Sequence, residues 1–107
     1  MQDYEIKRGH RRLLEGGRLR AMMEEVFGNV SEEGGALVSS FGALAKLTVI
    51  WDGGDALRVE TRMDPKVPPD VAQRTIKAYN TFLEKATGFT AKERARRLQK
   101  RAKEGRL

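Results

Sequence analysis

The chain has 107 residues, of which 39% are hydrophobic and 34% are charged, and its formal net charge is +6. It contains no cysteine, which excludes disulfides and thiolate metal sites, and no apolar run approaches the roughly 20 residues of a membrane-spanning helix. A chain of this length is expected to form one domain. Because residues 1–5 lack the pattern of a signal peptide, we also expect a cytoplasmic protein.

The chain begins with a predicted strand and a predicted helix. Polar and apolar residues alternate from Tyr4 to Arg8, which indicates a short strand. From about Arg11 to Phe27 the apolar residues recur at three-to-four spacing, which indicates a helix. Gly16 and Gly17 interrupt this segment. Because an interior glycine costs about 1 kcal/mol relative to alanine, the helix is expected to begin only after them.

A hairpin at residues 43–63 is the centre of the predicted sheet. Before it, residues 31–35 indicate a polar, acidic loop and residues 36–41 indicate a strand. Within the hairpin, apolar and polar residues alternate on both sides of a turn at Gly53 and Gly54, which accept the positive φ values of such turns. The sheet should therefore have one apolar face, which the helices must cover. The residues expected on that face are Ala45, Leu47, Val49, Trp51, Leu57, Val59, Thr61 and Met63.

The clearest predicted helix runs from Val71 to Ala86. The segment from Pro65 to Pro69 is expected to be a rigid connector, neither helix nor inner strand, because proline lacks an N–H group. The apolar residues of the helix fall within an arc of about 140°, so one helix face should pack on the sheet. The predicted core consists of Leu47, Val49, Trp51, Leu57, Val59, Ile76, Tyr79, Phe82 and Leu83.

A last helix is predicted to begin at a capping box, in which Thr90 is the N-cap and Glu93 reaches back to it. Only alanines and Leu98 share an apolar face, so we expect this helix to dock shallowly. Residues 1–89 contain 13 basic and 13 acidic residues, so the positive surplus lies entirely in residues 90–107. We therefore divide the chain into a compact α+β core, residues 1–89, and a basic C-terminal helix of the same domain, residues 90–107.

The expected fold is α+β with the element order β-α-β-β-β-α-α, an antiparallel sheet of about four strands with helices packed on one face. Its inner α-β-β-β-α order resembles double-stranded-RNA-binding domains by topology alone. The basic cluster of that family is absent at residues 68–73, so RNA binding is not carried over. Residues 4–10 and 87–94 resemble a small archaeal domain family of unknown function, which implies a fold and no activity.

Catalytic motifs are absent from the sequence. His10 is the single histidine, so a multi-histidine metal site is excluded. The acidic pairs at residues 24–25 and 32–33 are adjacent in sequence, and such neighbours do not face each other on a helix. The glycine pairs match no phosphate-binding loop of the Walker or dinucleotide type. We therefore expect a protein without catalytic activity, cofactor or metal ion.

Two groups of basic residues are the candidate binding sites, one near the N-terminus and one in the last helix. Basic residues on successive helical turns can follow a polyanion, which predicts nucleic-acid binding through the C-terminal helix. No aromatic residue lies between Thr90 and Leu107, so base stacking and sequence specificity are not expected. The predicted site contains Lys7, Arg8, Arg11, Arg12, Lys92, Arg94, Arg97, Lys100, Arg101 and Lys103.

The helical spacing divides the last helix into two basic flanks. Arg94, Arg97 and Arg101 share one flank and form the predicted contact row. The opposite flank carries Lys92, Arg96 and Lys103. A second interpretation stays open, in which the helix binds an acidic protein partner or serves assembly, including a homodimer. The predicted partners are therefore the backbone of RNA or DNA, or an acidic protein, and no membrane.

Overall fold

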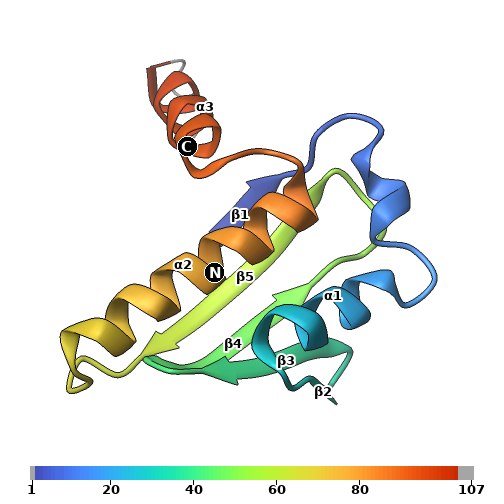
Figure 1. The fold of residues 1–107 in the computed structure, drawn as a ribbon. Helices are drawn as coiled ribbons and strands as arrows, with labels where there is room; N and C mark the ends of the chain where they lie inside the picture. Colours follow the sequence, from blue (N-terminus) through green and yellow to red (C-terminus); the bar gives the residue numbers. More distant parts are fainter. Residues whose placement is uncertain (1, 104–107) are drawn as a thin grey trace.

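The computed structural model describes the backbone of residues 2–103 and the side chains of residues 2–100. Five strands form one antiparallel sheet in the order β1-β5-β4-β3-β2 (Figure 1). The strands are β1 (Gln2–Glu5), β2 (Ser31–Glu33), β3 (Ala36–Phe41), β4 (Leu44–Ile50) and β5 (Ala56–Met63). The helices are a 3-10 turn η1 (His10–Leu13), α1 (Arg18–Phe27), α2 (Pro69–Thr87) and α3 (Ala91–Lys103).

Consecutive strands from β2 to β5 pair with one another, and β1 joins the sheet outside β5. β1 covers only part of β5, because its register runs from Gln2 opposite Val59 to Glu5 opposite Ala56. Helices α1 and α2 lie on the same face of the sheet (Figure 1). The predicted α+β fold with an antiparallel sheet is therefore confirmed.

The sheet has five strands and not about four, because residues 31–33 form a strand where a loop was predicted. Ser31 pairs with Val38, and Glu33 pairs with Ala36. All residues of β2 are exposed, so the strand shows no apolar alternation by which the sequence could reveal it. It forms because backbone pairing to β3 does not require a buried side chain.

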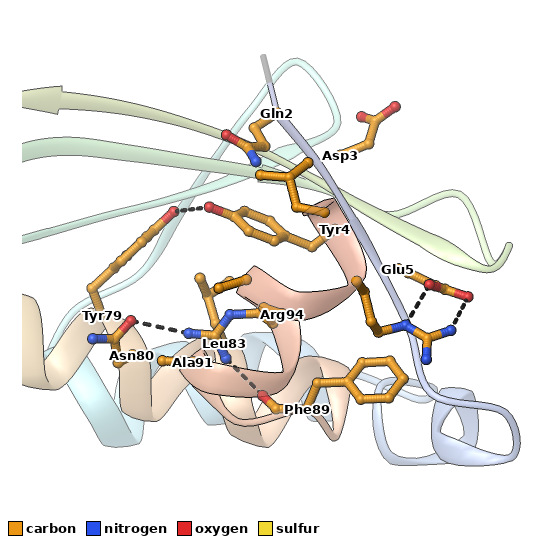
Figure 2. Close-up of a pocket in the computed structure, with 13 residues that line it drawn as sticks. Gln2, Asp3, Tyr4, Glu5, Tyr79, Asn80, Leu83, Phe89, Ala91 and Arg94 are labelled. Carbon is orange, nitrogen blue, oxygen red and sulfur yellow. Dashed lines mark hydrogen bonds and ion pairs between the residues drawn. The ribbon is translucent and has the colours of Figure 1, made fainter. Parts of the chain in front are cut away.

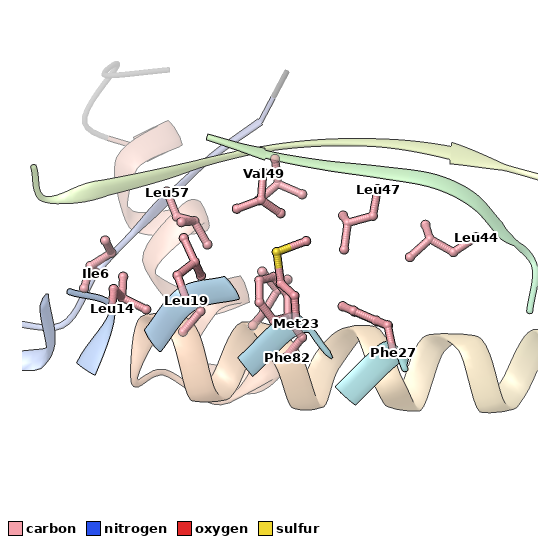
Figure 3. Packing of buried hydrophobic residues seen from close by; sticks show 13 residues of the cluster. Ile6, Leu14, Leu19, Met23, Phe27, Leu44, Leu47, Val49, Leu57 and Phe82 are labelled. Carbon is pink, nitrogen blue, oxygen red and sulfur yellow. The ribbon is translucent and has the colours of Figure 1, made fainter. Parts of the chain in front are cut away.

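The hydrophobic core lies between the sheet and the two helices that cover it (Figure 3). Met23 of α1 and Phe82 of α2 are fully buried, and they meet Leu47 and Leu57 of the sheet. The Phe27 ring packs against Phe82 at a tilt, with 5.5 Å between ring centroids and 55° between the ring planes. Among the predicted core residues, the fully buried ones are Leu47, Val49, Leu57, Val59, Phe82 and Leu83.

The predicted alternation fails at the first residues of β4. Leu44 is buried and Ala45 is exposed, whereas Ala45 was expected on the apolar face. The β4–β5 register shifts between Leu44 and Lys46. A bulge of this kind adds one residue to a strand and reverses the side to which the preceding residues point.

The same end of the expected core, where Met63 pairs with Leu44, is partly open to solvent. Ile76 is 55% exposed and Met63 is 49% exposed, so both predictions of burial were wrong. Tyr79 reaches Tyr4 of β1, but Ile76 lies about one turn earlier in α2, near the beginning of β1. Short β1 thus leaves this end of α2 uncovered.

The beginning of α2 corrects the sequence analysis, and the beginning of α1 confirms it. Helix α2 begins at Pro69, although Pro69 was assigned to a non-helical connector. Proline is accepted at the first helical position because the N–H of that residue has no intrahelical partner. Helix α1 begins at Arg18, directly after Gly17, which confirms that the helix starts after the glycine pair.

The C-terminus of α2 fixes the turn that leads into α3. Gly88 has a φ of 82°, and a Cβ atom there would lie 2.9 Å from His10 Nδ1 and 3.0 Å from Lys7 Cβ. Any other residue would therefore be strained in its backbone and crowded by the loop after β1. The buried Thr87 hydroxyl donates to Leu83 O at 2.6 Å and accepts from Phe89 N at 3.2 Å, which positions Phe89.

The helical phase of α2 is tested by two truncations. Leu83→Ala is expected to lower the free energy of unfolding by about 2–5 kcal/mol, because Leu83 is buried between helix and sheet. Ile76→Ala, the matched control on the same helix, is expected to change it by less than about 0.5 kcal/mol. Urea unfolding followed by circular dichroism measures both values. Equal losses for the two variants would contradict this packing.

Candidate functional site

Helix α3 begins at the predicted capping box, which the structure confirms. Thr90 N donates to Glu93 Oε1 at 3.0 Å, and Glu93 N donates to Thr90 Oγ1 at 3.2 Å. Hydrogen bonding of its carboxyl group to the backbone N–H of Thr90, and secondarily to the Thr90 side chain, lowers the pKa of Glu93. The box fixes the phase of α3, and thereby decides which basic side chains point toward the domain and which point away.

Arg94 points toward the domain and is half-buried. Its guanidinium donates to Phe89 O at 2.6 Å and to Asn80 Oδ1 of α2 at 3.0 Å (Figure 2). Both acceptors are neutral. Burial lowers the pKa of Arg94, and the nearby Tyr4 and Tyr79 oppose that shift. Arg94 therefore joins α3 to the C-terminal half of α2.

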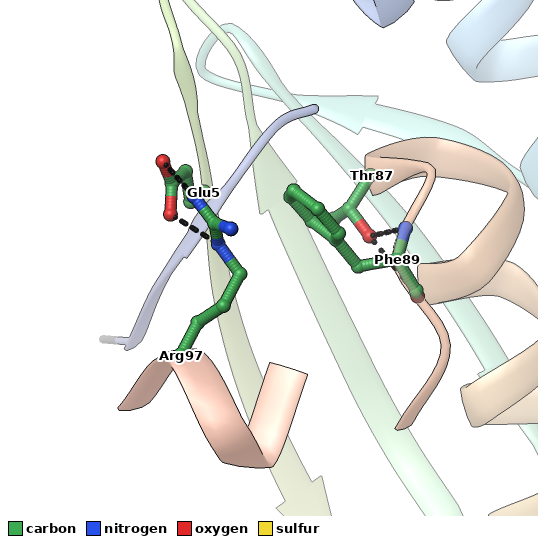
Figure 4. Close-up of polar contacts among 4 residues, drawn as sticks. All are labelled: Glu5, Thr87, Phe89 and Arg97. Carbon is green, nitrogen blue, oxygen red and sulfur yellow. Dashed lines mark hydrogen bonds and ion pairs between the residues drawn. The ribbon is translucent and has the colours of Figure 1, made fainter. Parts of the chain in front are cut away.

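Arg97 also points toward the domain, and it joins α3 to β1. Its Nε and one terminal nitrogen each donate to a carboxylate oxygen of Glu5 at 2.7 Å, a bidentate ion pair (Figure 4). The same guanidinium lies 4.4 Å from the centroid of the Phe89 ring. The hydrogen bonds with Glu5 raise the pKa of Arg97. Planar stacking combined with a bidentate pair is a geometry that arginine supports and lysine does not.

The outward row of α3 consists of Lys92, Arg96 and Lys100. All three side chains are exposed, and none makes an ion pair or a side-chain hydrogen bond within residues 2–100. A hollow lined by Phe89, Glu93, Arg96, Arg97 and Lys100 runs beside this row. Among the described side chains, the free flank of α3 is therefore the one opposite the predicted contact row, and Arg96, absent from the predicted site, belongs to it.

The predicted contact row of Arg94, Arg97 and Arg101 is divided by these contacts. Arg94 and Arg97 are bound to the domain itself. Arg101 and Lys103 lie within the backbone of α3, but their side chains are outside the described residues. Helical phase alone revealed the two flanks. It could not reveal which of them faces β1, because that depends on the turn at Gly88.

The N-terminal basic residues lie beside the beginning of α3. Lys7 N donates to Thr87 O at 2.7 Å, and His10 Nε2 donates to Lys85 O at 2.6 Å, so the loop after β1 packs on the end of α2. The charge of Lys7 acts on Glu93 and contributes to its lowered pKa. The two basic groups, far apart in sequence, are therefore neighbours at the α2–α3 turn.

The members of the N-terminal basic group differ in whether their side chains form ion pairs or hydrogen bonds. Lys7 and Arg8 are exposed and make no side-chain hydrogen bond or ion pair with the described residues. Arg11 pairs with Asp55 at 3.5 Å and also donates to Gly53 O. Arg12 is exposed, and its carbonyl accepts a hydrogen bond from Arg18. Lys7 is thus the member that lies close to α3, and neither Lys7 nor the adjacent Arg8 forms an ion pair within the described residues.

A cleft lies between β1, the end of α2 and α3 (Figure 2). We call it the junction cleft. Its volume is about 250 Å³. The hydroxyls of Tyr4 and Tyr79 are 3.2 Å apart, and burial raises the pKa of Tyr79. The cleft is lined by Gln2, Asp3, Tyr4, Glu5, Tyr79, Asn80, Leu83, Phe89, Ala91, Arg94, Ala95, Arg97 and Leu98.

The described residues contain neither a metal-binding cluster nor a helix that could span a membrane. No group of three or more histidine, cysteine, aspartate or glutamate side chains that could hold a metal ion occurs among them. Within the same residues, no helix combines the length and the apolar composition needed to span a bilayer. The basic surface around α3 and the junction cleft are therefore the two features that the structure offers as candidate sites.

Comparison with known proteins places the fold but not an activity. Residues 1–100 match the family described as Domain of unknown function (DUF5611). No curated protein matches the chain. The NMR solution structure of a hypothetical protein from Thermoplasma acidophilum is similar, with 22% identity and a TM-score of 0.61 over 92% of this chain and 97% of that one. At this identity the likeness shows the fold alone. The resemblance to a small archaeal family of unknown function is confirmed.

The Glu5–Arg97 pair is tested by a double-mutant cycle. Glu5→Gln and Arg97→Gln are expected to show a coupling free energy toward the upper end of the roughly 0.2–1 kcal/mol found for exposed pairs, because the pair is bidentate. The coupling should fall as salt is added. The matched control is the pair Lys85–Glu25, which has a single contact at 3.1 Å and should couple less. A larger coupling for the control would contradict the assignment.

The capping box is tested by acid titration. The folded pKa of Glu93 lies below its ordinary value of 4.5. A depressed carboxyl pKa stabilises the folded helix above the ordinary value, and this contribution disappears as the pH falls through the folded pKa. NMR titration of the Glu93 carboxyl carbon should therefore give a midpoint below 4.5, and the Thr90 amide should shift at the same midpoint. A midpoint at or above 4.5 would contradict the capping geometry.

Proposed function

The chain belongs to the family described as Domain of unknown function (DUF5611), so its role must be argued from its own surface, and we propose that it is a non-catalytic domain that binds the backbone of nucleic acid. The binding surface consists of the outward row of α3 together with Lys7 and Arg8. The observation that carries this proposal is a row of exposed cations without an ion pair among the described residues, on one flank of a helix whose other flank is bound to the domain.

The spacing of the outward row supports a linear polyanion as the ligand. Lys92, Arg96 and Lys100 follow one another at four-residue intervals, so their positions are about 6 Å apart along the helix axis. Lys7 and Arg8 extend the positive surface from the first turn of α3 onto the core of the domain. Such an array can neutralise several consecutive phosphates, and the release of their counterions drives binding.

The surface provides no means of reading bases. Phe89, the aromatic residue nearest to the row, is buried and covered by Arg97. Trp51 is half-buried, and its indole nitrogen donates to Gly54 O at 2.9 Å. Without an exposed ring beside the row, stacking on bases does not contribute, so affinity comes from charge and is indifferent to sequence.

The proposal is tested by the salt dependence of binding to a single-stranded RNA and to a DNA duplex, followed by fluorescence anisotropy. Engagement of roughly four phosphates gives a log–log slope of about −3 to −4. Replacing Lys92, Arg96 and Lys100 together by glutamine should bring the slope on the duplex to about −1 and weaken RNA and DNA binding alike. Circular dichroism should show an unchanged fold.

The control triple is Arg62→Gln, Lys66→Gln and Lys77→Gln. These residues are exposed, lie away from α3 and have no ion pair within residues 2–100. Because three cations are replaced by glutamine in each triple, the control changes the net charge by the same amount as the outward-row triple. The control should keep the wild-type slope. Equal losses from both triples would mean diffuse attraction without a docking surface. Absence of wild-type binding at low salt would end the nucleic-acid proposal.

A protein-interaction role is favoured by a different observation. Residues 61–63 of β5 have no neighbouring strand on the β1 side among the described residues, and Ile76 and Met63 are exposed beside them. A free strand edge next to apolar side chains is a site at which another chain can add a strand. Self-association of the protein alone, measured as a sedimentation coefficient that rises with protein concentration, would favour this role over nucleic-acid binding if Met63→Asp abolishes it.

A further inference from the structure

We propose that the junction cleft is a binding site for a small organic acid, whose carboxylate is held by Arg94 and the tyrosine hydroxyls and whose apolar body lies against α3. The site is distinct from the outward row, because Arg94 points away from that row and toward the domain. Figure 2 shows Arg94 between Asn80 of α2 and Tyr4 of β1. The proposal does not depend on nucleic-acid binding.

Among the described residues, the charges around the cleft leave Arg94 without an ion-pair partner. Glu5 pairs with Arg97 at 2.7 Å, and Asp3 lies 3.6 Å from Arg58. Arg94 makes no ion pair with any carboxylate among the described residues, and Glu84 is only a minor electrostatic influence on it. A half-buried cation whose partners are both neutral favours an anionic ligand.

The donors of the cleft are the Arg94 guanidinium and the two tyrosine hydroxyls, whereas the carboxylates in its lining, Asp3 and Glu5, are paired with Arg58 and Arg97. A guanidinium has five N–H groups, and two of those in Arg94 are used by Phe89 O and Asn80 Oδ1. The hydroxyls of Tyr4 and Tyr79 hold two protons but share one hydrogen bond, so one proton is available to a ligand. A carboxylate accepts several hydrogen bonds and donates none, which matches this set.

Volume and lining restrict the rest of the ligand. A volume of about 250 Å³ is below the roughly 300–1,000 Å³ of usual ligand pockets, so the occupant is smaller than a nucleotide. The apolar part of the lining consists of Leu83, Phe89, Ala91, Ala95 and Leu98, and the last three lie on α3 together with Arg94. A compact apolar group, such as a single ring or a branched aliphatic chain, fits this lining.

Benzoate is the probe for this site, and benzamide is its neutral isostere. Chemical shifts of the ¹⁵N-labelled full chain are followed during titration with each compound at constant ionic strength. Benzoate should give saturable shifts centred on Tyr4, Asn80, Arg94 and Ala95. Benzamide should bind at least about tenfold more weakly, because it has no negative charge to pair with Arg94.

Three variants separate the cleft from general attraction to a basic protein. Tyr79→Phe should weaken benzoate binding several-fold while the fold is kept, because it removes a single hydroxyl. Arg94→Gln should abolish saturation. Since Arg94 also holds α3, Tyr79→Phe is the decisive variant. Arg96→Gln, the matched control on the outward row, should leave benzoate binding unchanged.

Four results would overturn the proposal. The first is equal binding of benzoate and benzamide, which would show that charge is not recognised. The second is benzoate shifts centred on Lys92, Arg96 and Lys100, which would show attraction to the outward row. The third is saturable binding that Tyr79→Phe and Arg94→Gln leave unchanged. Absence of saturable shifts from benzoate would equally exclude the site.

Discussion

The structure depends on the burial of one face of the sheet beneath α1 and α2. Met23, Phe27 and Phe82 from the helices fill the space over Leu47 and Leu57. The two helices thus cover the apolar face of the sheet. Little apolar area is left for a third helix. Helix α3 is therefore attached at the edge of the domain by polar contacts, and its orientation is decided by charge and hydrogen bonding.

This mode of attachment gives the two flanks of α3 different properties. Arg94 and Arg97 face β1 and α2, where Asn80, Phe89 and Glu5 provide their partners. Within residues 2–100, the cations on the other flank have no such partners and face solvent. One amphipathic pattern, made of positive charges on both sides of a narrow alanine stripe, thus produces a docking face and a free cationic face. The two proposed sites lie on opposite sides of the same helix.

The loop after β1 connects these features. It packs against the α2–α3 turn, where Gly88 leaves room for His10 and Lys7. This contact brings the N-terminal basic residues next to the first turn of α3, and β1 contributes Tyr4 and Glu5 to the junction cleft. In this member of a family of unknown function, β1 and the loop after it therefore meet the end of α2 and the beginning of α3 at a polar junction.

The sequence by itself determined the local elements and their faces. Period-two alternation located β4 and β5, helical periodicity and Gly17 located α1 and α2, and Thr90 with Glu93 located the beginning of α3, because these signals act over a few neighbouring residues. The sequence also determined that the charge surplus lies in the last helix. Only the tertiary structure decided that Ile76 is exposed and that Arg97 binds Glu5. Those outcomes depend on where β1 begins and how the chain turns at Gly88, which are contacts between segments far apart in sequence.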